Sequence, residues 1–167
     1  MKTLLLIRHA KSSWKDPSLT DLQRPLKKRG IRNAGDMAGR LASLDHGVER
    51  VFTSPARRAI ETLELMTEAS GFGRDAAEVL ADLYSFDYDD VMLTLRKIDD
   101  RWQSVAVVGH NPAITDLVNF LALEHIANIP TCGIALLHLD IDQWGEMRAG
   151  CGKLSHYDFP KNEPGEE

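Results

Sequence analysis

The sequence contains few cysteines, few aromatic residues and no long apolar run, and each shortage excludes a class of protein. The two cysteines among 167 residues, Cys132 and Cys151, provide neither a disulfide framework nor the spacing of metal ligands. No apolar segment approaches the ~18 residues of a membrane span, and the leading run is shorter than a signal peptide requires. Aromatic residues make up 7% of a chain whose net charge is -5, which argues against nucleic-acid binding. We therefore expect a cytoplasmic protein that contacts neither membranes nor nucleic acids.

Basic residues are concentrated in the N-terminal part of the sequence. Residues 1–32 contain nine Lys or Arg residues and two acids, Asp16 and Asp21, so this segment carries +7 and the remainder -12. A basic segment within an acidic protein indicates a focused anion-binding site. A helix start that is simply exposed to water has the same charge pattern, so charge alone leaves both interpretations open.

Apolar, β-branched segments alternate with segments of helical periodicity. We expect strands at residues 3–7, 48–53, 77–80, 104–108, 133–139 and 146–151, and helices at 26–44, 55–69, 87–98 and 113–123. This alternation predicts a three-layer α/β sandwich, in which a mostly parallel sheet has helices on both faces. We find no repeat and no second domain, and expect a single domain at 1–160 and a flexible polar tail at 161–167.

Reactive side chains follow three of the expected strands. Arg8 and His9 follow the first strand, Arg57 and Arg58 the second, and His110 the strand at 104–108. Ligands of open α/β sheets bind beyond the carboxyl ends of the strands. If the three strands are parallel neighbours, two histidines and at least two arginines converge at one edge of the sheet.

Histidine and arginine together suit phosphoryl transfer. A neutral histidine ring with one nitrogen held as a donor presents the lone pair of its other nitrogen as a nucleophile. Arginine matches the oxygens of a phosphoryl group, whose transfer depends mainly on positioning and charge neutralisation. The sequence lacks a Walker A loop, an HExxH motif and a carboxylate cluster suited to Mg²⁺. We therefore expect a route through a phosphorylated histidine, with no metal ion and no cofactor.

Four segments resemble, in the right order, the motifs of the histidine phosphatase superfamily, the phosphoglycerate-mutase-like enzymes. LLLIRHAKSSW resembles the segment with the Arg-His-Gly signature, SPARRAIET resembles the second motif, and VVGHNP is similar to the segment with the second histidine. RPLKKRGIRNA is similar to the segment after the first loop, especially in the small SixA-type phosphohistidine phosphatases. The resemblance covers about residues 3–124 and implies the phosphoglycerate-mutase-like fold.

The resemblance also implies roles for six residues. His9 matches the nucleophile that becomes phosphorylated. Three residues match those that hold the phosphoryl group and stabilise its charge: Arg8, Arg58 and His110. Two more match positions that bind the substrate: Ser12 and Arg24.

The chain departs from the family pattern at two places. Ala10 replaces the glycine of the signature, so we infer that this position does not need a positive φ. Many relatives carry a glutamate as the general acid in the region that corresponds to ADLYSFDYDD, where Ser85 falls nearest here. Four aspartates are close by but none is clearly placed: Asp82, Asp87, Asp89 and Asp90.

The missing acid favours one substrate class. An imidazole, whose conjugate acid has a pKa of about 6.5, leaves without the proton donor that the expulsion of an alkoxide requires. We therefore expect a metal-independent phosphatase that acts on phosphohistidine of a protein. Small sugar or aryl phosphates are the alternative substrates, and a phosphoprotein-binding module without turnover is the alternative function.

The surroundings of the expected site leave two questions open. Trp14 either packs against its own loop or contacts the substrate. Lys27, Lys28 and Arg29 either form a helix start exposed to water or steer an anionic partner towards the site.

Overall fold

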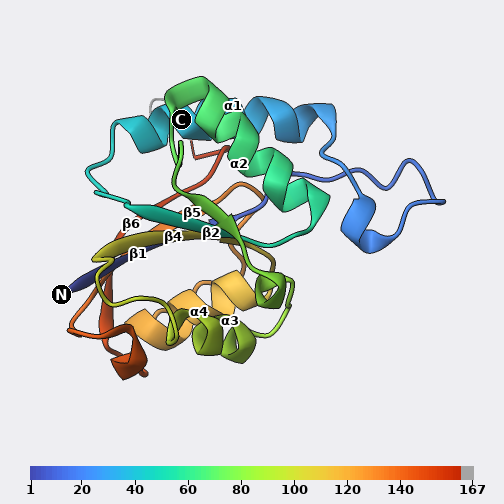
Figure 1. Cartoon of the computed structure of the whole chain (residues 1–167). Coiled ribbons are helices and arrows are strands. Elements are labelled where there is room, and N and C mark those ends of the chain that lie inside the picture. Colours follow the sequence, from blue (N-terminus) through green and yellow to red (C-terminus); the bar gives the residue numbers. More distant parts are fainter. Residues whose placement is uncertain (163–167) are drawn as a thin grey trace.

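The computed structural model describes residues 1–162, in which six strands, four helices and three short 3-10 turns alternate (Figure 1). The strands are β1 (Lys2–Arg8), β2 (Arg50–Thr53), β3 (Ala77–Val79), β4 (Ser104–Gly109), β5 (Ile134–Leu139) and β6 (Gly152–Asp158). The helices are α1 (Lys28–Ala42), α2 (Arg57–Ser70), α3 (Tyr88–Leu95) and α4 (Ala113–Ala122), and the turns are η1 (Asp21–Gln23), η2 (Ala81–Leu83) and η3 (Trp144–Glu146). None of these helices has both the length and the apolar character to cross a membrane.

The strands form one mixed sheet in the order β3-β2-β4-β1-β5-β6. β1 pairs in parallel with β4, and β2 pairs in parallel with both β4 and β3. β5 runs antiparallel to β1 and to β6. The predicted α/β sandwich with a mostly parallel sheet is confirmed, and the two C-terminal strands supply its antiparallel part.

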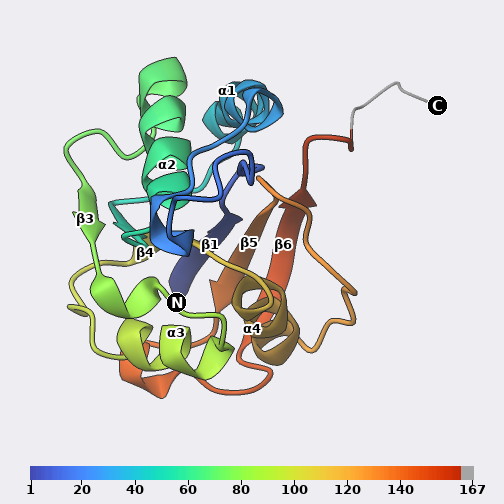
Figure 2. The ribbon, with the colours of Figure 1, turned by 90° about the vertical axis from the view of Figure 1, so that its right-hand side faces the viewer.

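Helices cover both faces of the sheet. Figures 1 and 2 show α1 and α2 on one face and α3 and α4 on the other. The β1 side chains alternate between two buried clusters, with Leu5 and Ile7 facing α1 and α2, and Leu4 and Leu6 facing α3 and α4. A strand buried on both faces requires an apolar residue at every position. This requirement accounts for the apolar run at the start of the sequence.

The expected strand at 146–151 is wrong, because this segment forms the end of a turn and a loop. The last strand of the described chain is β6, which begins at Gly152. The Glu146 side chain accepts a hydrogen bond from the Gln143 backbone N–H (2.8 Å) and so closes η3. Gly150 has a φ of 72°, which interrupts an extended backbone. Met147 and Cys151 are buried as part of a loop instead, whereas Ala149 is exposed.

Arg40 of α1 holds the chain that follows β6. Its guanidinium donates hydrogen bonds to the carbonyl oxygens of Phe159 (2.9 Å), Pro160 (3.0 Å) and Asn162 (3.1 Å). The backbone as far as Asn162 is therefore tied to α1. Of the tail expected at 161–167, residues 163–167 lie outside the described part of the chain.

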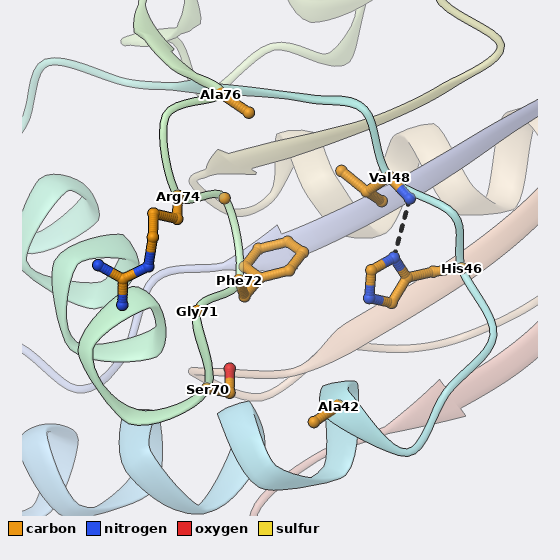
Figure 3. Close-up of a pocket in the computed structure, with 9 residues that line it drawn as sticks. Ala42, His46, Val48, Ser70, Gly71, Phe72, Arg74 and Ala76 are labelled. Atoms are coloured by element: carbon orange, nitrogen blue, oxygen red, sulfur yellow. Dashed lines mark hydrogen bonds between the residues drawn. The ribbon is translucent and has the colours of Figure 1, made fainter.

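A cavity of about 300 Å³ lies where the chain enters β2 and β3, at the amino ends of these strands (Figure 3). The His46 Nδ1 atom accepts a hydrogen bond from the Val48 backbone N–H (2.9 Å), and its ring meets Phe72 edge-on at 5.5 Å. His46 therefore stabilises a turn between α1 and β2, and does not take part in the histidine pair at the other end of the sheet.

Gly30 allows α1 to approach the loop that follows His9. A Cβ atom at this position would lie 2.3 Å from the Lys11 carbonyl oxygen. The same oxygen accepts a hydrogen bond from the Lys27 backbone N–H (3.0 Å), and Ser12 forms an isolated antiparallel bridge with Leu26. The start of α1 thus fixes the backbone beside the histidine.

Replacing Gly30 with alanine should lower the free energy of unfolding by about 1–3 kcal/mol, because the added methyl group must displace backbone atoms. Gly35 on the same helix provides the control, since a Cβ atom there meets nothing within 4 Å. Gly35→Ala should be neutral or stabilise the protein by up to about 1 kcal/mol. Urea unfolding of both variants measures the difference, and equal effects would contradict the close approach at Gly30.

Candidate active site

Two histidines meet where β1 and β4 end. Arg8 is paired with Gly109 in the parallel register, so the residues that follow, His9 and His110, lie side by side with ring centres 5.1 Å apart. The His9 backbone N–H donates to the Gly109 carbonyl oxygen (3.1 Å), which extends the pairing by one residue. The parallel pair of strands therefore sets the distance between the two rings.

The His9 ring is neutral and has a defined tautomer. Its Nδ1 atom lies 2.7 Å from the Ala10 carbonyl oxygen, which only accepts, so Nδ1 carries the proton. The Nε2 lone pair faces Arg58, whose Nε–H donates to it at 3.3 Å. Burial lowers the pKa of His9 to about 3; the hydrogen bond to Ala10 opposes this shift, and His110 and then Arg58 add to it. The ring nitrogen that faces the arginine is thus unprotonated at neutral pH, which is the state that nucleophilic attack requires.

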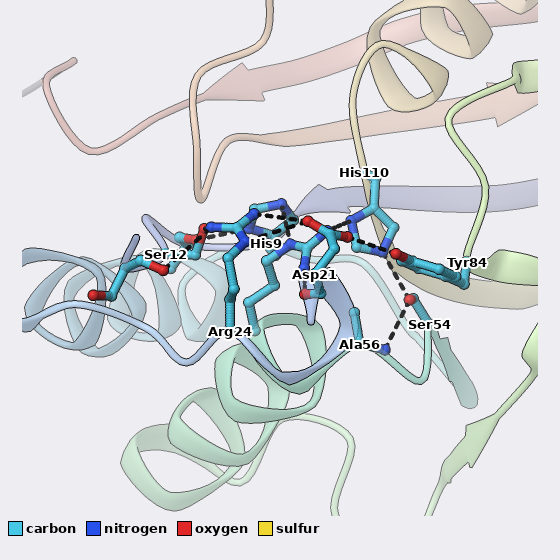
Figure 4. A network of polar contacts seen from close by, with 11 residues as sticks. His9, Ser12, Asp21, Arg24, Ser54, Ala56, Tyr84 and His110 are labelled. Atoms are coloured by element: carbon cyan, nitrogen blue, oxygen red, sulfur yellow. Dashed lines mark hydrogen bonds and ion pairs between the residues drawn. The ribbon is translucent and has the colours of Figure 1, made fainter. Parts of the chain in front are cut away.

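Figure 4 shows the polar network around His9, Asp21 and His110. Arg58 joins the two histidines of this network. This residue of the first turn of α2 is only 1% exposed, and its Nη2 donates to His110 Nδ1 at 3.3 Å. The His110 proton must then lie on Nε2, which donates to Ser54 Oγ at 2.7 Å. Burial, followed by the Arg58 charge, lowers the pKa of His110 to about 4. The two neutral rings therefore hold opposite tautomers.

Asp21 is a site residue that the sequence analysis missed. Its Oδ2 atom accepts hydrogen bonds from Arg58 Nη2 (2.9 Å) and from the Tyr84 hydroxyl (2.6 Å), and its Oδ1 accepts from Arg24 Nε (3.2 Å). Its carbonyl oxygen accepts from Arg58 Nη1 at 2.7 Å. Partial burial opposes ionisation of Asp21, but the Tyr84 and Arg58 hydrogen bonds outweigh it and lower its pKa to about 2. The one sequence signal was an acid within a strongly basic segment.

Arg24 and Ser12 lie beside the two histidines and line one cavity with them. Arg24 is buried, and its Nη1 donates to Ser12 Oγ at 2.7 Å. Its guanidinium carbon lies 3.5 Å from the centre of the Trp14 ring, which is 74% exposed. Trp14 therefore covers Arg24 on one side and presents its other surface to solvent.

Arg8 lines the same cavity and has one unused donor. Its Nη1 donates to the Ile129 carbonyl oxygen (2.8 Å), whereas its buried Nε has no partner among residues 1–162. A buried donor without an acceptor costs about 1–3 kcal/mol. This arrangement favours a ligand that brings an acceptor oxygen.

All six residues expected at the site line one cavity of about 300 Å³. Its walls are formed by Arg8, His9, Lys11, Ser12, Trp14, Asp21, Arg24, Arg58, Phe86, His110, Asn111 and Thr131. Arg57 does not belong to it, because this arginine points outwards and pairs with Glu61 (3.1 Å). The cavity is rich in cations and contains two neutral imidazoles, which suits a phosphoryl group.

Neither departure from the family motifs disrupts the site. Ala10 is absent from the positive-φ residues of the described chain, so the expectation that alanine fits here is confirmed. Its backbone N–H donates to Thr62 Oγ1 (2.9 Å), and this hydroxyl donates to the Arg58 carbonyl oxygen (2.6 Å). The threonine of the second motif therefore connects the residue after His9 to the first turn of α2.

The region expected to hold a general acid brings no carboxylate to the cavity. The Ser85 hydroxyl donates to Asp90 Oδ2 (2.7 Å), and Asp87 caps α3 by accepting from the Asp89 N–H (2.9 Å). Phe86 borders the cavity instead, with its ring centre 5.4 Å from that of His110. Within residues 1–162, Asp21 is the one carboxylate among the lining side chains.

Comparison with known proteins agrees with this geometry. Residues 4–103 match the model of the histidine phosphatase superfamily, branch 1. The uncharacterized protein Rv1276c of Mycobacterium tuberculosis is 33% identical over 166 residues, which cover 93% of this chain and 100% of the relative. The chain therefore belongs to the histidine phosphatase superfamily.

Two solved structures share the fold. The protein histidine phosphatase SixA in complex with tungstate has a TM-score of 0.79 and 28% identity, over 96% of this chain and 98% of that chain. A mycobacterial glucosyl-3-phosphoglycerate phosphatase in complex with VO3 has a TM-score of 0.68 and 16% identity, over 95% of this chain and 100% of that chain. The second likeness, at this low identity, concerns the fold alone.

Both histidines should stay neutral well below the pH at which an unfolded histidine, with a pKa of about 6.5, becomes charged. Nitrogen-15 NMR of labelled protein should show a proton on Nδ1 of His9 and on Nε2 of His110 down to about pH 5. Because the folded pKa values of about 3 and 4 are the lower ones, the unfolded chain binds protons first as the pH falls. The free energy of unfolding should therefore decrease below about pH 6.5. Protonation of either ring near that pH would contradict the assignment.

Proposed function

We propose that this protein is a phosphatase that works through a phosphohistidine intermediate at His9. The observation that carries the proposal is the fixed orientation of the His9 ring. Its Nδ1–H donates a hydrogen bond to the Ala10 carbonyl oxygen, and its Nε2 faces Arg58. The unpartnered Nε of Arg8 and the buried Arg58 are suited to hold phosphoryl oxygens beside this nitrogen. Membership of the histidine phosphatase superfamily supports the same chemistry.

The proposed reaction has two displacements. In the first, the Nε2 lone pair of His9 attacks phosphorus, a P–N bond forms, and the bond to the leaving group breaks with its electron pair. In the second, water attacks phosphorus, the P–N bond breaks, and the lone pair returns to His9 while the water proton leaves with inorganic phosphate. Arg8, Arg58 and Arg24 neutralise the charge on the phosphoryl oxygens throughout, which is the main requirement of phosphoryl transfer.

We further propose that the substrate is phosphohistidine on a protein. The carboxylate of Asp21 is ionised at neutral pH and has no proton to donate to a leaving group. A phosphohistidine ring leaves as a neutral imidazole that keeps the proton on its other nitrogen, whereas an alkoxide needs a donor. The likeness to the protein histidine phosphatase SixA supports this substrate class.

A role for small phosphate esters is the alternative. The fold is also that of a glucosyl-3-phosphoglycerate phosphatase, but at 16% identity this likeness says nothing about which substrate this chain takes. For either substrate, we propose that arginine side chains supply the positive charge and that no metal ion is needed.

Purified protein and its His9→Ala variant should be offered a phosphohistidine protein and a panel of sugar and aryl phosphates, with and without a chelator. We expect chelator-resistant phosphate release that depends on His9 and is fastest with phosphohistidine. Acid-labile, base-stable phosphate trapped on the wild type, and absent from His9→Ala, identifies the intermediate. Faster release from esters would overturn the substrate assignment, and phosphopeptide binding without turnover would identify a binding module.

Arg58→Ala should lower kcat by about 10²- to 10³-fold, because the buried guanidinium contacts His9 Nε2, the atom proposed to attack phosphorus. Arg58→Lys keeps the charge but loses the planar fork, so its kcat should also stay low. The matched control is Arg57→Ala, since this neighbouring arginine is half exposed and pairs only with Glu61 in the described chain. Equal kinetics of Arg57→Ala and Arg58→Ala, with both variants folded by circular dichroism, would refute the role of Arg58.

A further inference from the structure

A second and larger hollow adjoins the candidate active site. It encloses about 710 Å³ and shares Trp14 with the catalytic cavity. Leu26 and Ile31 give it an apolar part, and Trp14 and Ile31 are 74% and 47% exposed. In Figure 1 the loop between β1 and α1 lies beside the first turn of α1, and these two segments form the hollow.

Four cations also line this hollow: Lys15, Lys27, Lys28 and Arg29. None of them forms an ion pair with a carboxylate of residues 1–162. Among residues 1–162, no acidic side chain lines this hollow, although the protein as a whole carries -5. The surface of these four cations with Trp14 and Ile31, called here the Trp14 surface, is thus strongly positive on an acidic protein.

The cations at the start of α1 are unfavourable for the helix itself. Lys28 and Arg29 occupy its first turn, Lys27 precedes them, and the first turn contains no acid. The helix dipole places partial positive charge at this end, so a cation there is unfavourable and an acid would be favourable. A helix start that is merely exposed to water would be more stable with the opposite charge. An anionic partner would interact favourably with these cations and so account for their presence at this end of the helix.

We propose that the Trp14 surface binds an acidic, partly apolar segment of the substrate protein next to its phosphohistidine. This inference rests on the proposed phosphohistidine phosphatase activity. A chain whose phosphohistidine enters the catalytic cavity passes over Trp14, because this residue borders both hollows. Acidic side chains then meet the lysines of α1, and an apolar side chain meets Trp14 and Ile31.

Two synthetic phosphohistidine peptides test the proposal, identical except that glutamates flank the phosphohistidine in one and glutamines in the other. The wild type should hydrolyse the glutamate peptide with a kcat/KM about tenfold higher at low salt, and this advantage should shrink as ionic strength rises. The Lys27→Glu/Lys28→Glu variant should lose this preference for the glutamate peptide, because its KM for that peptide rises. Its kcat and its hydrolysis of free phosphohistidine should be retained. The new acids suit the helix start, so the variant should fold.

The control variant is Lys97→Glu/Lys153→Glu, which changes the net charge equally. Both lysines are exposed and lie towards the opposite end of the sheet, since Lys153 is paired with His138 and His138 with Thr3. This variant should keep the preference for the glutamate peptide. Equal hydrolysis of both peptides by the wild type, or equal loss on both in the α1 variant, would overturn the docking surface alone. No hydrolysis of any phosphohistidine probe by the wild type would overturn the proposed function and this inference together.

Discussion

The site depends on the burial of one guanidinium group. Arg58 is almost fully enclosed, and a buried charge is tolerated only when its hydrogen bonds are satisfied. Its donors are used by both histidine rings and by the side chain and backbone of Asp21. Because arginine only donates, it fixes the lone pairs of His9 and His110 towards itself. One group thereby orients both rings and fixes their tautomers, and its charge adds to the burial that lowers both pKa values.

The sheet supplies the accuracy that this network requires. β1 is central and buried on both faces, and its register with β4 places His9 and His110 at equivalent positions. The loop after His9 is then fixed from two sides, by Thr62 of α2 and by the close approach of α1 at Gly30. Together these contacts leave His9 little conformational freedom, which lowers the entropy cost of reaching a reactive geometry.

The sequence predicted those parts of the site whose signals are local. The apolar strand before Arg8 and His9, and the strand at 104–108 before His110, predicted the histidine pair. The motif SPARRAIET predicted Arg58 beside it. Asp21 and Tyr84 were missed because their role exists only through contacts across 37 and 63 residues, respectively, with Arg58 and Asp21. The strand expected at 146–151 failed for the opposite reason, since a side-chain cap and a glycine with positive φ overrode an apolar pattern.

The electrostatics of the cavity also bear on its substrate. Four cationic side chains and one carboxylate line it, which leaves a surplus of three positive charges for a phosphoryl group. Burial, with these cations, keeps His9 unprotonated, as the proposed attack on phosphorus requires. Hydrogen bonds from Tyr84 and Arg58 keep Asp21 ionised. Among residues 1–162, the one carboxylate of the lining is thus ionised and cannot act as a general acid. This supports the proposed phosphohistidine substrate, because an imidazole departs with less need of a proton donor than an alkoxide.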